Sequence, residues 1–178
     1  MNYNIFVISD THFAHANCYS FYNFDGTKMR PWSTDEEADE IMIQNWNSLV
    51  GPHDRIYHLG DVGFNRNKLD QILPRLNGRK VLIKGNHDLF KPNFYLKYFE
   101  DIRACHNRDN YLLTHIPVHP ASKARFKRNL HGHIHGNPLG DNSDVWYKNC
   151  CVEVNNYSPI PFDLIVEETN KYKAAGLL

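Results

Sequence analysis

Short apolar runs recur along the chain and end abruptly in polar residues. Residues 4–9, 55–59 and 80–84 each follow this pattern, which is typical of strands buried in a sheet. Later runs at residues 111–114 and 149–154 predict two further strands.

Amphipathic stretches between these runs predict helices. Ser33 and Glu36 form a capping-box pattern, and Gly51 and Pro52 would stop the helix that follows. The residues expected on one face of this helix are Ala38, Ile41, Met42, Asn45, Trp46 and Leu49. Shorter helices are expected at residues 68–76, broken at Pro74, at residues 93–99, and from Pro161 to about Lys171.

The order of these elements indicates the fold class. Strands alternate with helices at first and dominate afterwards, so we expect an α/β (α+β) fold with a mixed sheet or sandwich flanked by helices. With 178 residues, 42% of them hydrophobic, the chain can bury a sizeable core, and we expect a single domain over residues 1–178. This composition excludes a disordered or fibrous protein.

Charge and apolar patterning narrow the functional class. The 20 basic residues balance 20 acidic ones, so no global field points to nucleic acid or an anionic membrane. The apolar runs are too short to span a membrane, and the N-terminal segment meets Asp10 too soon for a signal peptide, so we expect a cytoplasmic protein. Four cysteines without C-x-x-C spacing are expected to be reduced, structural thiols: Cys18, Cys105, Cys150 and Cys151.

Metal-ligand residue types gather where the predicted strands end. The chain reads DTH at 10–12, GD at 60–61 and GNHD at 85–88, each directly after a strand, and His115 follows a fourth strand. Loops at strand ends are where open sheets of this kind place their ligands. These loops are therefore the expected position of a functional site.

The segment LHGHIHG at 130–136 adds His133 and His135. Only an extended or tightly turned backbone brings both rings to one place, and Gly132 and Gly136 would permit such a turn. Taken alone, the segment fits a metal site and a histidine-rich surface loop equally well.

Together these positions supply more ligands than one small ion takes. The set is Asp10, His12, Asp61, Asn86, His115, His133 and His135. Such oxygen and nitrogen ligands without thiolate favour manganese, iron, nickel or zinc over a structural zinc site. We expect two divalent metal ions, manganese being the first choice, that share a bridging carboxylate and serve a phosphoryl displacement.

The ordered motifs resemble those of the calcineurin-like metallophosphoesterases. The match runs through DTH at 10–12, GD at 60–61, GNHD at 85–88, TH at 114–115 and GHIH at 132–135, about three quarters of the chain. DTHFAHAN near the start and the stretch RPWSTDEEADEIMIQNWN resemble a compact branch of this family in bacteria and their phages. The resemblance implies a two-sheet β-sandwich flanked by helices, with a dinuclear site at the strand ends.

The resemblance also implies how the ligands are shared. One ion would be held by Asp10, His12, Asp61 and His135, and the other by Asp61, Asn86, His115 and His133. Asp61 would bridge, and His131 lies outside the family motif. The implied activity is hydrolysis of phosphate esters, with phosphodiesters ahead of monoesters, by a hydroxide formed from a water that both cations share.

Two residues beside Asn86 are candidates for acid catalysis. His87 would protonate the departing alkoxide. Asp88 would either accept the other imidazole proton and orient His87, or cap the turn, and the sequence favours neither role.

Substrate contacts are expected at the mouth of the site. His15 and Asn17 match the compact branch, although a loop hydrogen bond is slightly favoured for Asn17. Arg30 would either contact a substrate phosphate or lie at the surface. Larger family members read G-D-x-x-D-R, whereas Asp61 is followed here by VGFNR, which puts phosphate clamping by Arg66 in doubt.

A basic segment at residues 122–129, SKARFKRN, could track a nucleic-acid backbone with Phe126 for stacking. Charge runs are usually solvated surface, so a small phosphate ester or nucleotide is expected ahead of nucleic acid. The alternatives are a phosphomonoesterase and a non-catalytic scaffold of the same fold. Because every ligand position and His87 are filled, the sequence favours an enzyme.

Overall fold

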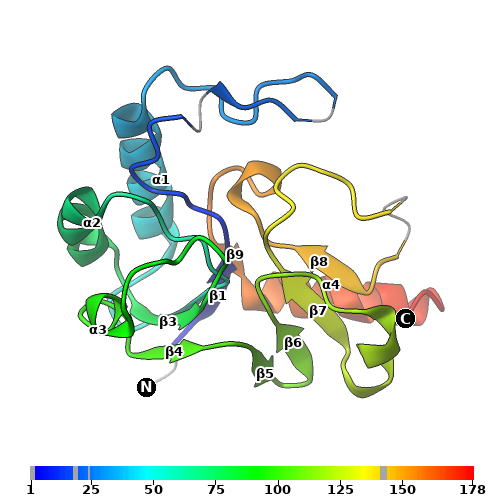
Figure 1. The fold of residues 1–178 in the computed structure, drawn as a ribbon. Coiled ribbons are helices and arrows are strands. Elements are labelled where there is room, and N and C mark those ends of the chain that lie inside the picture. Colours follow the sequence, from blue (N-terminus) through cyan, green and yellow to red (C-terminus); the bar gives the residue numbers. More distant parts are fainter. Residues whose placement is uncertain (1–2, 18–19, 24, 141–143) are drawn as a thin grey trace.

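The computed structural model describes residues 3–17, 20–23, 25–140 and 144–178 and has an α/β fold, with two mixed sheets flanked by helices (Figure 1). This confirms the expected class and the two-sheet arrangement. The first sheet has the strand order β4-β3-β2-β1-β9. Its strands are β1 (Ile5–Ile8), β2 (Arg55–His58), β3 (Arg79–Ile83), β4 (Asp101–Arg103) and β9 (Ile160–Pro161). β9 is antiparallel to β1, and the other pairings are parallel.

The second sheet has the strand order β5-β6-β7-β8. Its strands are β5 (His106–Arg108), β6 (Tyr111–Leu113), β7 (Arg128–His131) and β8 (Tyr147–Asn149). β5 is antiparallel to β6, whereas β6, β7 and β8 run parallel to one another. The carboxyl ends of these three strands therefore share one edge of the sheet.

Side chains of the first sheet alternate between two apolar cores. Ile8 and Ile56 belong to the core under the helices α1 (Asp35–Leu49), α2 (Arg66–Ile72) and α3 (Pro92–Tyr95). Val7 and Tyr57 belong to the core shared with the second sheet. This division follows from the two-residue period of a strand. Phe162 of α4 (Phe162–Ala174) adds to the second core, its ring 5.1 Å from that of Tyr111.

Helix α1 (Asp35–Leu49) begins one residue later than the capping pattern predicts. Thr34 is the N-cap, and its side chain accepts a hydrogen bond from the main-chain N–H of Glu37. The sequence offers two overlapping S/T-x-x-E patterns, and the second one is used. Ile43 is buried on the inner face, whereas Leu49, expected there, is 44% exposed.

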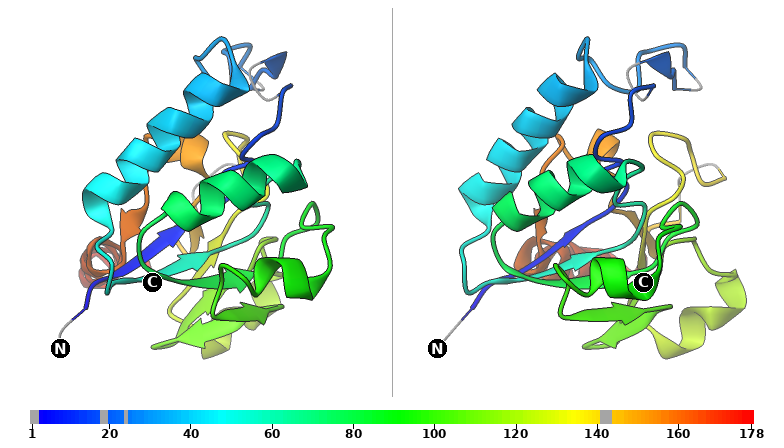
Figure 2. Two further views of the ribbon diagram at one scale, coloured as in Figure 1. Left: turned by 90° about the vertical axis from the view of Figure 1, so that its left-hand side faces the viewer. Right: turned by 60° about the vertical axis from the view of Figure 1, so that its left-hand side comes forward.

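The other helices lie near their expected positions. α2 (Arg66–Ile72) starts at the Asn65 cap and runs into a 3-10 turn, η2 (Leu73–Arg75), that contains Pro74. α3 (Pro92–Tyr95) is a single helical turn. Figure 2 shows α1 and α2 side by side on the same face of the first sheet.

The prediction of a strand at residues 149–154 is wrong. β8 ends at Asn149, and the chain continues through one isolated parallel bridge, between Cys151 and Ser9, into a 3-10 turn, η4 (Val152–Val154). The bridge ties the carboxyl end of β8 to that of β1, so the two sheets meet at the edge where their polar loops emerge. Cys105, Cys150 and Cys151 are free thiols. Cys105 is exposed and the other two are buried, so the expected structural role suits only Cys150 and Cys151. Cys18 lies outside the described residues.

In the part of the chain that the structure describes, no helix combines the length and the apolar character needed to cross a lipid bilayer.

Candidate metal centre

Six strand-end loops meet where the two sheets meet, and five of them carry the seven expected ligands. Asp10, Asp61 and Asn86 follow β1, β2 and β3 of the first sheet. His115 follows β6 of the second sheet, and His133 and His135 follow β7. The sixth loop follows β8 and supplies Glu153, which the motifs do not include.

Five of these ligand residues adopt the left-handed backbone conformation that favours glycine. Their φ angles are 58° at Asp10, 45° at His12, 57° at Asp61, 72° at His133 and 51° at His135. Each such residue costs on the order of 1 kcal/mol or more, and such strain gathers at functional sites. The expectation that Gly132 and Gly136 make the turn is wrong, because the histidines themselves carry the positive φ angles.

Gly132 is needed for a different reason, the close approach of two loops. A Cβ atom at this position would lie 2.2 Å from Asp10 Oδ2 and 2.0 Å from Ser9 Oγ. At Gly85 it would lie 2.2 Å from Asp61 Oδ1. The glycines before His133 and Asn86 thus leave room for the neighbouring carboxylates.

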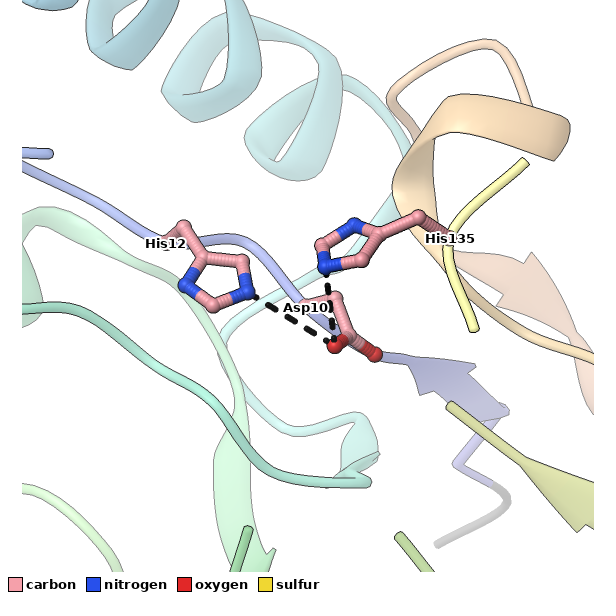
Figure 3. A group of neighbouring side chains, drawn as sticks. All are labelled: Asp10, His12 and His135. Atoms are coloured by element: carbon pink, nitrogen blue, oxygen red, sulfur yellow. Dashed lines mark ion pairs between the residues drawn. The ribbon is translucent and has the colours of Figure 1, made fainter. Parts of the chain in front are cut away.

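The first ligand cluster consists of Asp10, His12 and His135 (Figure 3). The Nε2 atoms of His12 and His135 lie 3.7 and 3.9 Å from Asp10 Oδ1. Asp10 Oδ2 accepts hydrogen bonds from His133 N at 2.9 Å and Cys151 Sγ at 3.3 Å. Oδ1 has no hydrogen-bond partner among the described residues, so it is the oxygen left for a cation.

The second cluster is centred on Asn86. Its Oδ1 atom lies 2.8 Å from His115 Nε2 and 2.9 Å from His133 Nδ1. Asp61 lies between the clusters, with Oδ2 3.7 Å from His12 Nε2 and 3.4 Å from His115 Nε2. Its Oδ1 atom accepts from His87 N at 2.8 Å, so Oδ2 is the oxygen that faces both clusters.

The donor set fits divalent cations, because acceptor atoms face one another at its centre. His115 Nδ1 lies 2.8 Å from the carbonyl oxygen of Leu59, which can only accept, so Nδ1 carries the proton and Nε2 presents a lone pair. That lone pair faces the oxygens of Asn86 and Asp61. Opposed buried acceptors are unfavourable unless a positive charge lies between them.

The electrostatics of the buried groups point the same way. Burial alone would raise the pKa of Asp10, but the imidazoles of His12 and His135 outweigh it and hold the pKa well below its usual range. Burial would lower the pKa of His115, but the carboxylates of Asp61 and Asp10 raise it overall. The site therefore favours ionised carboxylates and added positive charge.

Glu153 orients His135, and sequence reasoning missed it. Its side chain is 2% exposed, with Oε1 3.2 Å from His135 Nδ1 and 2.9 Å from the guanidinium of Arg30. A carboxylate this close to Nδ1 favours a proton on that nitrogen, and Nε2 is then the ring nitrogen left to face Asp10. Carboxylates that hold a ligand imidazole in this way are a recurring feature of metal sites.

Arg30 is neither a surface residue nor exposed to substrate, which corrects both expectations. It is 1% exposed and donates to the carbonyl oxygens of Thr11 and Asp10, each at 2.8 Å. These bonds and the ion pair with Glu153 support the left-handed backbone at Asp10. Arg30 thus joins the loop after β1 to the loop after β8.

His87 and Asp88 take different positions beside the centre. His87 is exposed, and its ring centroid lies 5.9 Å from that of His12. Asp88 is buried and accepts from the main-chain N–H groups of Asp61, Val62 and Gly85 at 2.8–2.9 Å. Among the described residues it makes no hydrogen bond to the His87 ring, so the geometry supports the turn-cap alternative over a catalytic partnership.

His15 and Asn17 lie on the loop after β1. The His15 ring is half-buried, 4.2 Å from the Phe64 ring and 5.9 Å from the His12 ring, and burial lowers its pKa to about 4. Asn17 is exposed, and its carbonyl oxygen accepts from Ser20 N at 2.9 Å. His15 is thus beside the centre, whereas Asn17 lies in a loop turn.

The basic segment at 122–129 lies away from the centre. Lys127 N donates to the carbonyl of Asn110, which precedes β6, whereas His115 follows the carboxyl end of that strand. Arg128 is not surface charge: it is 2% exposed and paired with Glu168 at 2.7 Å. The segment is therefore not a neighbour of the candidate metal centre.

No protein-family model matches the chain. It is 36% identical over 176 residues to the uncharacterized protein MJ1445 of Methanocaldococcus jannaschii, covering 95% of this chain and 93% of that protein. The protein of unknown function AQ665 from Aquifex aeolicus superposes with a TM-score of 0.74 at 27% identity, over 93% of this chain and 99% of that one. The nuclease MPE of Pseudomonas putida overlaps with a TM-score of 0.47 at 20% identity, over 74% of this chain and 61% of that one. A likeness at this level does not extend the nuclease activity to this chain.

Proposed function

We propose that this chain, which belongs to the same family as the uncharacterized protein MJ1445 of Methanocaldococcus jannaschii, is a metal-dependent phosphoesterase of the calcineurin-like metallophosphoesterase type. The observation that carries the proposal is Asp61 Oδ2, one oxygen that faces His12 at 3.7 Å and His115 at 3.4 Å. A carboxylate oxygen shared by two ligand clusters suits a two-metal centre.

One ion would be held by Asp10, His12, Asp61 and His135, and the other by Asp61, Asn86, His115 and His133. Two divalent cations bound there would supply Lewis acidity to a water and to the phosphoryl oxygens, manganese being the first choice. The chain's own part is to fix these side chains. Glu153 orients the His135 ring, and the carbonyl oxygen of Leu59 orients the His115 ring. The Cys151 thiol donates to Asp10 Oδ2, the oxygen that does not face the cluster.

His87 is proposed as the proton donor to the leaving alkoxide. Its main-chain N–H holds Asp61 Oδ1 at 2.8 Å, which leaves the exposed imidazole free to reach toward a bound ester. Asp88 keeps this loop in place by binding three main-chain amides. Proton donation and loop placement thus fall to different residues.

Within this class we propose phosphodiesters ahead of monoesters. A monoester dianion brings one more negative charge than a diester, and a cationic side chain in contact with the transferred phosphate itself would favour it. Arg30, the arginine expected for this role, is buried against Glu153 and two main-chain carbonyls. A singly charged diester fits this environment better.

The test is a substrate screen of the protein loaded with Mn²⁺. Bis(p-nitrophenyl) phosphate, p-nitrophenyl phosphate and cyclic nucleotides would be compared, with the Asp61→Ala variant and chelator-treated protein as controls. We expect turnover of diesters above monoesters and none in the controls. Faster monoester turnover would favour a phosphomonoesterase, and bound metal without turnover of any ester would favour a non-catalytic scaffold.

A further inference from the structure

A pocket of about 360 Å³ is formed by residues that follow two of the proposed metal ligands along the chain. Its lining residues lie at the start of α2, in the loop after β3 and in α3, the segments that follow Asp61 and Asn86 along the chain: Arg66, Leu89, Phe90, Lys91, Asn93 and Phe94. Leu89 N donates to the carbonyl of His87 at 2.9 Å, and the Phe64 ring lies 5.2 Å from the His87 ring. Leu89, one of the residues that line the pocket, is therefore in direct contact with His87, the proposed proton donor.

Two cations, Arg66 and Lys91, line this pocket, and Asp70 is the carboxylate whose pKa Arg66 helps to lower. Within the described ranges, neither Arg66 nor Lys91 forms an ion pair, whereas Lys68, Arg75 and Arg79 nearby on the chain all do. The Arg66 guanidinium lies 5.3 Å from the Phe94 ring centroid, so the first residue of α2 packs against α3. Two cations that form no direct ion pair, close to a proposed phosphoester site, attract a further anion.

The pocket surface between Arg66 and Lys91 includes the apolar side chains of Leu89 and Phe90. Leu89 is 77% exposed, the largest value among the large apolar side chains of the described residues. Phe90 stands next to it, with its ring 5.0 Å from that of Phe94. An exposed apolar surface flanked by cations matches a nucleic-acid strand, in which bases alternate with phosphates.

We propose that this Arg66–Lys91 pocket binds the nucleotide next to the scissile phosphate of a short single strand. Leu89 and Phe90 contact its base, and Arg66 and Lys91 bind its phosphate. The inference rests on the proposed function and deepens it, because it names an oligonucleotide as the substrate. It also differs from the nucleic-acid contact considered for residues 122–129, which lie away from the centre.

The test compares two double variants of equal charge change. Arg66→Gln/Lys91→Gln removes the pocket cations, and Arg125→Gln/Lys127→Gln removes two cations of the distant basic segment. Each is assayed on the Mn²⁺-loaded protein with pentathymidylate and with bis(p-nitrophenyl) phosphate, which has no neighbouring nucleotide. Binding of fluorescein-labelled pentathymidylate to the metal-free protein is measured by anisotropy across a salt series.

We expect the ratio of kcat/KM for pentathymidylate to that for bis(p-nitrophenyl) phosphate to fall about tenfold in the pocket variant and to stay unchanged in the control. The slope of log affinity against log salt should flatten by about 0.7 for each phosphate that the variant no longer binds. Leu89→Ser should weaken pentathymidylate binding with the salt slope retained, because it removes apolar surface and no charge.

Equal behaviour of the two double variants would overturn the pocket assignment, as would an unchanged substrate ratio or salt slope. Failure of the proposed function gives a different result. In that case the wild-type protein hydrolyses no diester, and the anisotropy measurement still decides whether Arg66 and Lys91 bind the strand.

Discussion

Each proposed carboxylate ligand keeps one oxygen for a cation because a neighbour occupies its other oxygen. Asp10 Oδ2 accepts from His133 N and Cys151 Sγ, which leaves Oδ1. The same division recurs at Asp61, where the His87 amide takes Oδ1. Such fixed orientation reduces the entropy lost when a metal binds, so the partner residues matter as much as the ligands.

Glu153 provides the residue-scale test of this orientation. Glu153→Gln keeps an oxygen for His135 Nδ1 but removes the charge that pairs with Arg30, and Glu153→Ala removes both. Loss of such a partner typically costs about 10–100-fold in metal affinity. We therefore expect the metal affinity to fall less in Glu153→Gln than in Glu153→Ala. Isothermal titration with Mn²⁺ would resolve two binding steps, of which the step involving His135 should weaken more. Equal weakening of both steps would indicate a merely structural role for Glu153.

His87 separates chemistry from metal binding. His87→Ala keeps the main-chain N–H that holds Asp61, so both ions should remain while turnover falls by about 10²–10⁴-fold. The loss should be smaller for p-nitrophenyl esters, because nitrophenolate leaves without a proton, than for alkyl or ribose esters. Rates on both ester types would be measured beside metal content. An equal loss of turnover on both ester types, with both metal ions still bound, would contradict the role of His87 as the general acid.

At the scale of the elements, the loops after β1 and β7 pack too closely for any side chain at Gly132. Gly132→Ala would force a Cβ atom against Ser9 and Asp10, so we expect weaker metal binding and lower stability, by about 1–3 kcal/mol. Gly26→Ala is the matched control: its Cβ meets open space, and only its positive φ of 81° carries a cost. Metal titration and urea unfolding of both variants would check this. Unchanged metal affinity in Gly132→Ala would contradict the close-approach argument.

Helix α1 contributes a pH-dependent contact to the loop after β1. Asp39 is 6% exposed, and both its oxygens accept from Ala14 N, at 3.0 and 3.1 Å. Burial raises its pKa from 3.8 to about 7. The folded protein therefore holds a proton on Asp39 that the unfolded chain releases between about pH 4 and pH 7.

The contribution of Asp39 to the free energy of unfolding is thus fully present below about pH 4, and it is lost as the pH rises to about 7. The loss is at most about 4 kcal/mol, at roughly 1.4 kcal/mol per pKa unit. Asp39→Asn should flatten the pH dependence and be more stable than the wild type at pH 8, measured by urea unfolding at pH 5 and pH 8. The same pH dependence in both proteins would refute this account of Asp39.

The sequence predicts the strand-end loops well because β1, β2 and β3 are continuous apolar runs that stop at a ligand. β4 and β5 escaped prediction because they are three residues long and only half-buried, with no apolar run. The start of α1 was ambiguous because Ser33 and Thr34 each have a glutamate three residues on. Short or ambiguous local signals thus account for β4, β5 and the start of α1.

Glu153 could not be found from local pattern. It contacts His135 and Arg30, 18 and 123 residues away in sequence, so only the pairing of β8 with β7 and the Ser9–Cys151 bridge bring it to the centre. The one local signal was an acidic residue inside the apolar stretch CCVEV. A buried acid in such a stretch requires a partner, but the sequence does not say which.

At the scale of the whole molecule, the proposed centre joins the two sheets. Asp10, Asp61 and Asn86 come from the first sheet, and His115, His133 and His135 from the second. A cation bound by both groups should hold the two sheets together and stabilise the folded chain by mass action. Asp61, whose Oδ2 atom faces both clusters, is the residue on which this coupling depends.

Native mass spectrometry of the chain reconstituted with Mn²⁺ tests the two-ion centre most directly. The wild-type protein should carry two ions. Asp61→Ala should weaken the binding of both ions, because the Oδ2 atom of Asp61 faces both ligand clusters. Asp163→Ala, which removes an exposed carboxylate from the first turn of α4, should retain two ions. A wild-type protein that binds at most one ion, or an Asp61→Ala variant that loses one ion and keeps the other at full affinity, would contradict the shared centre.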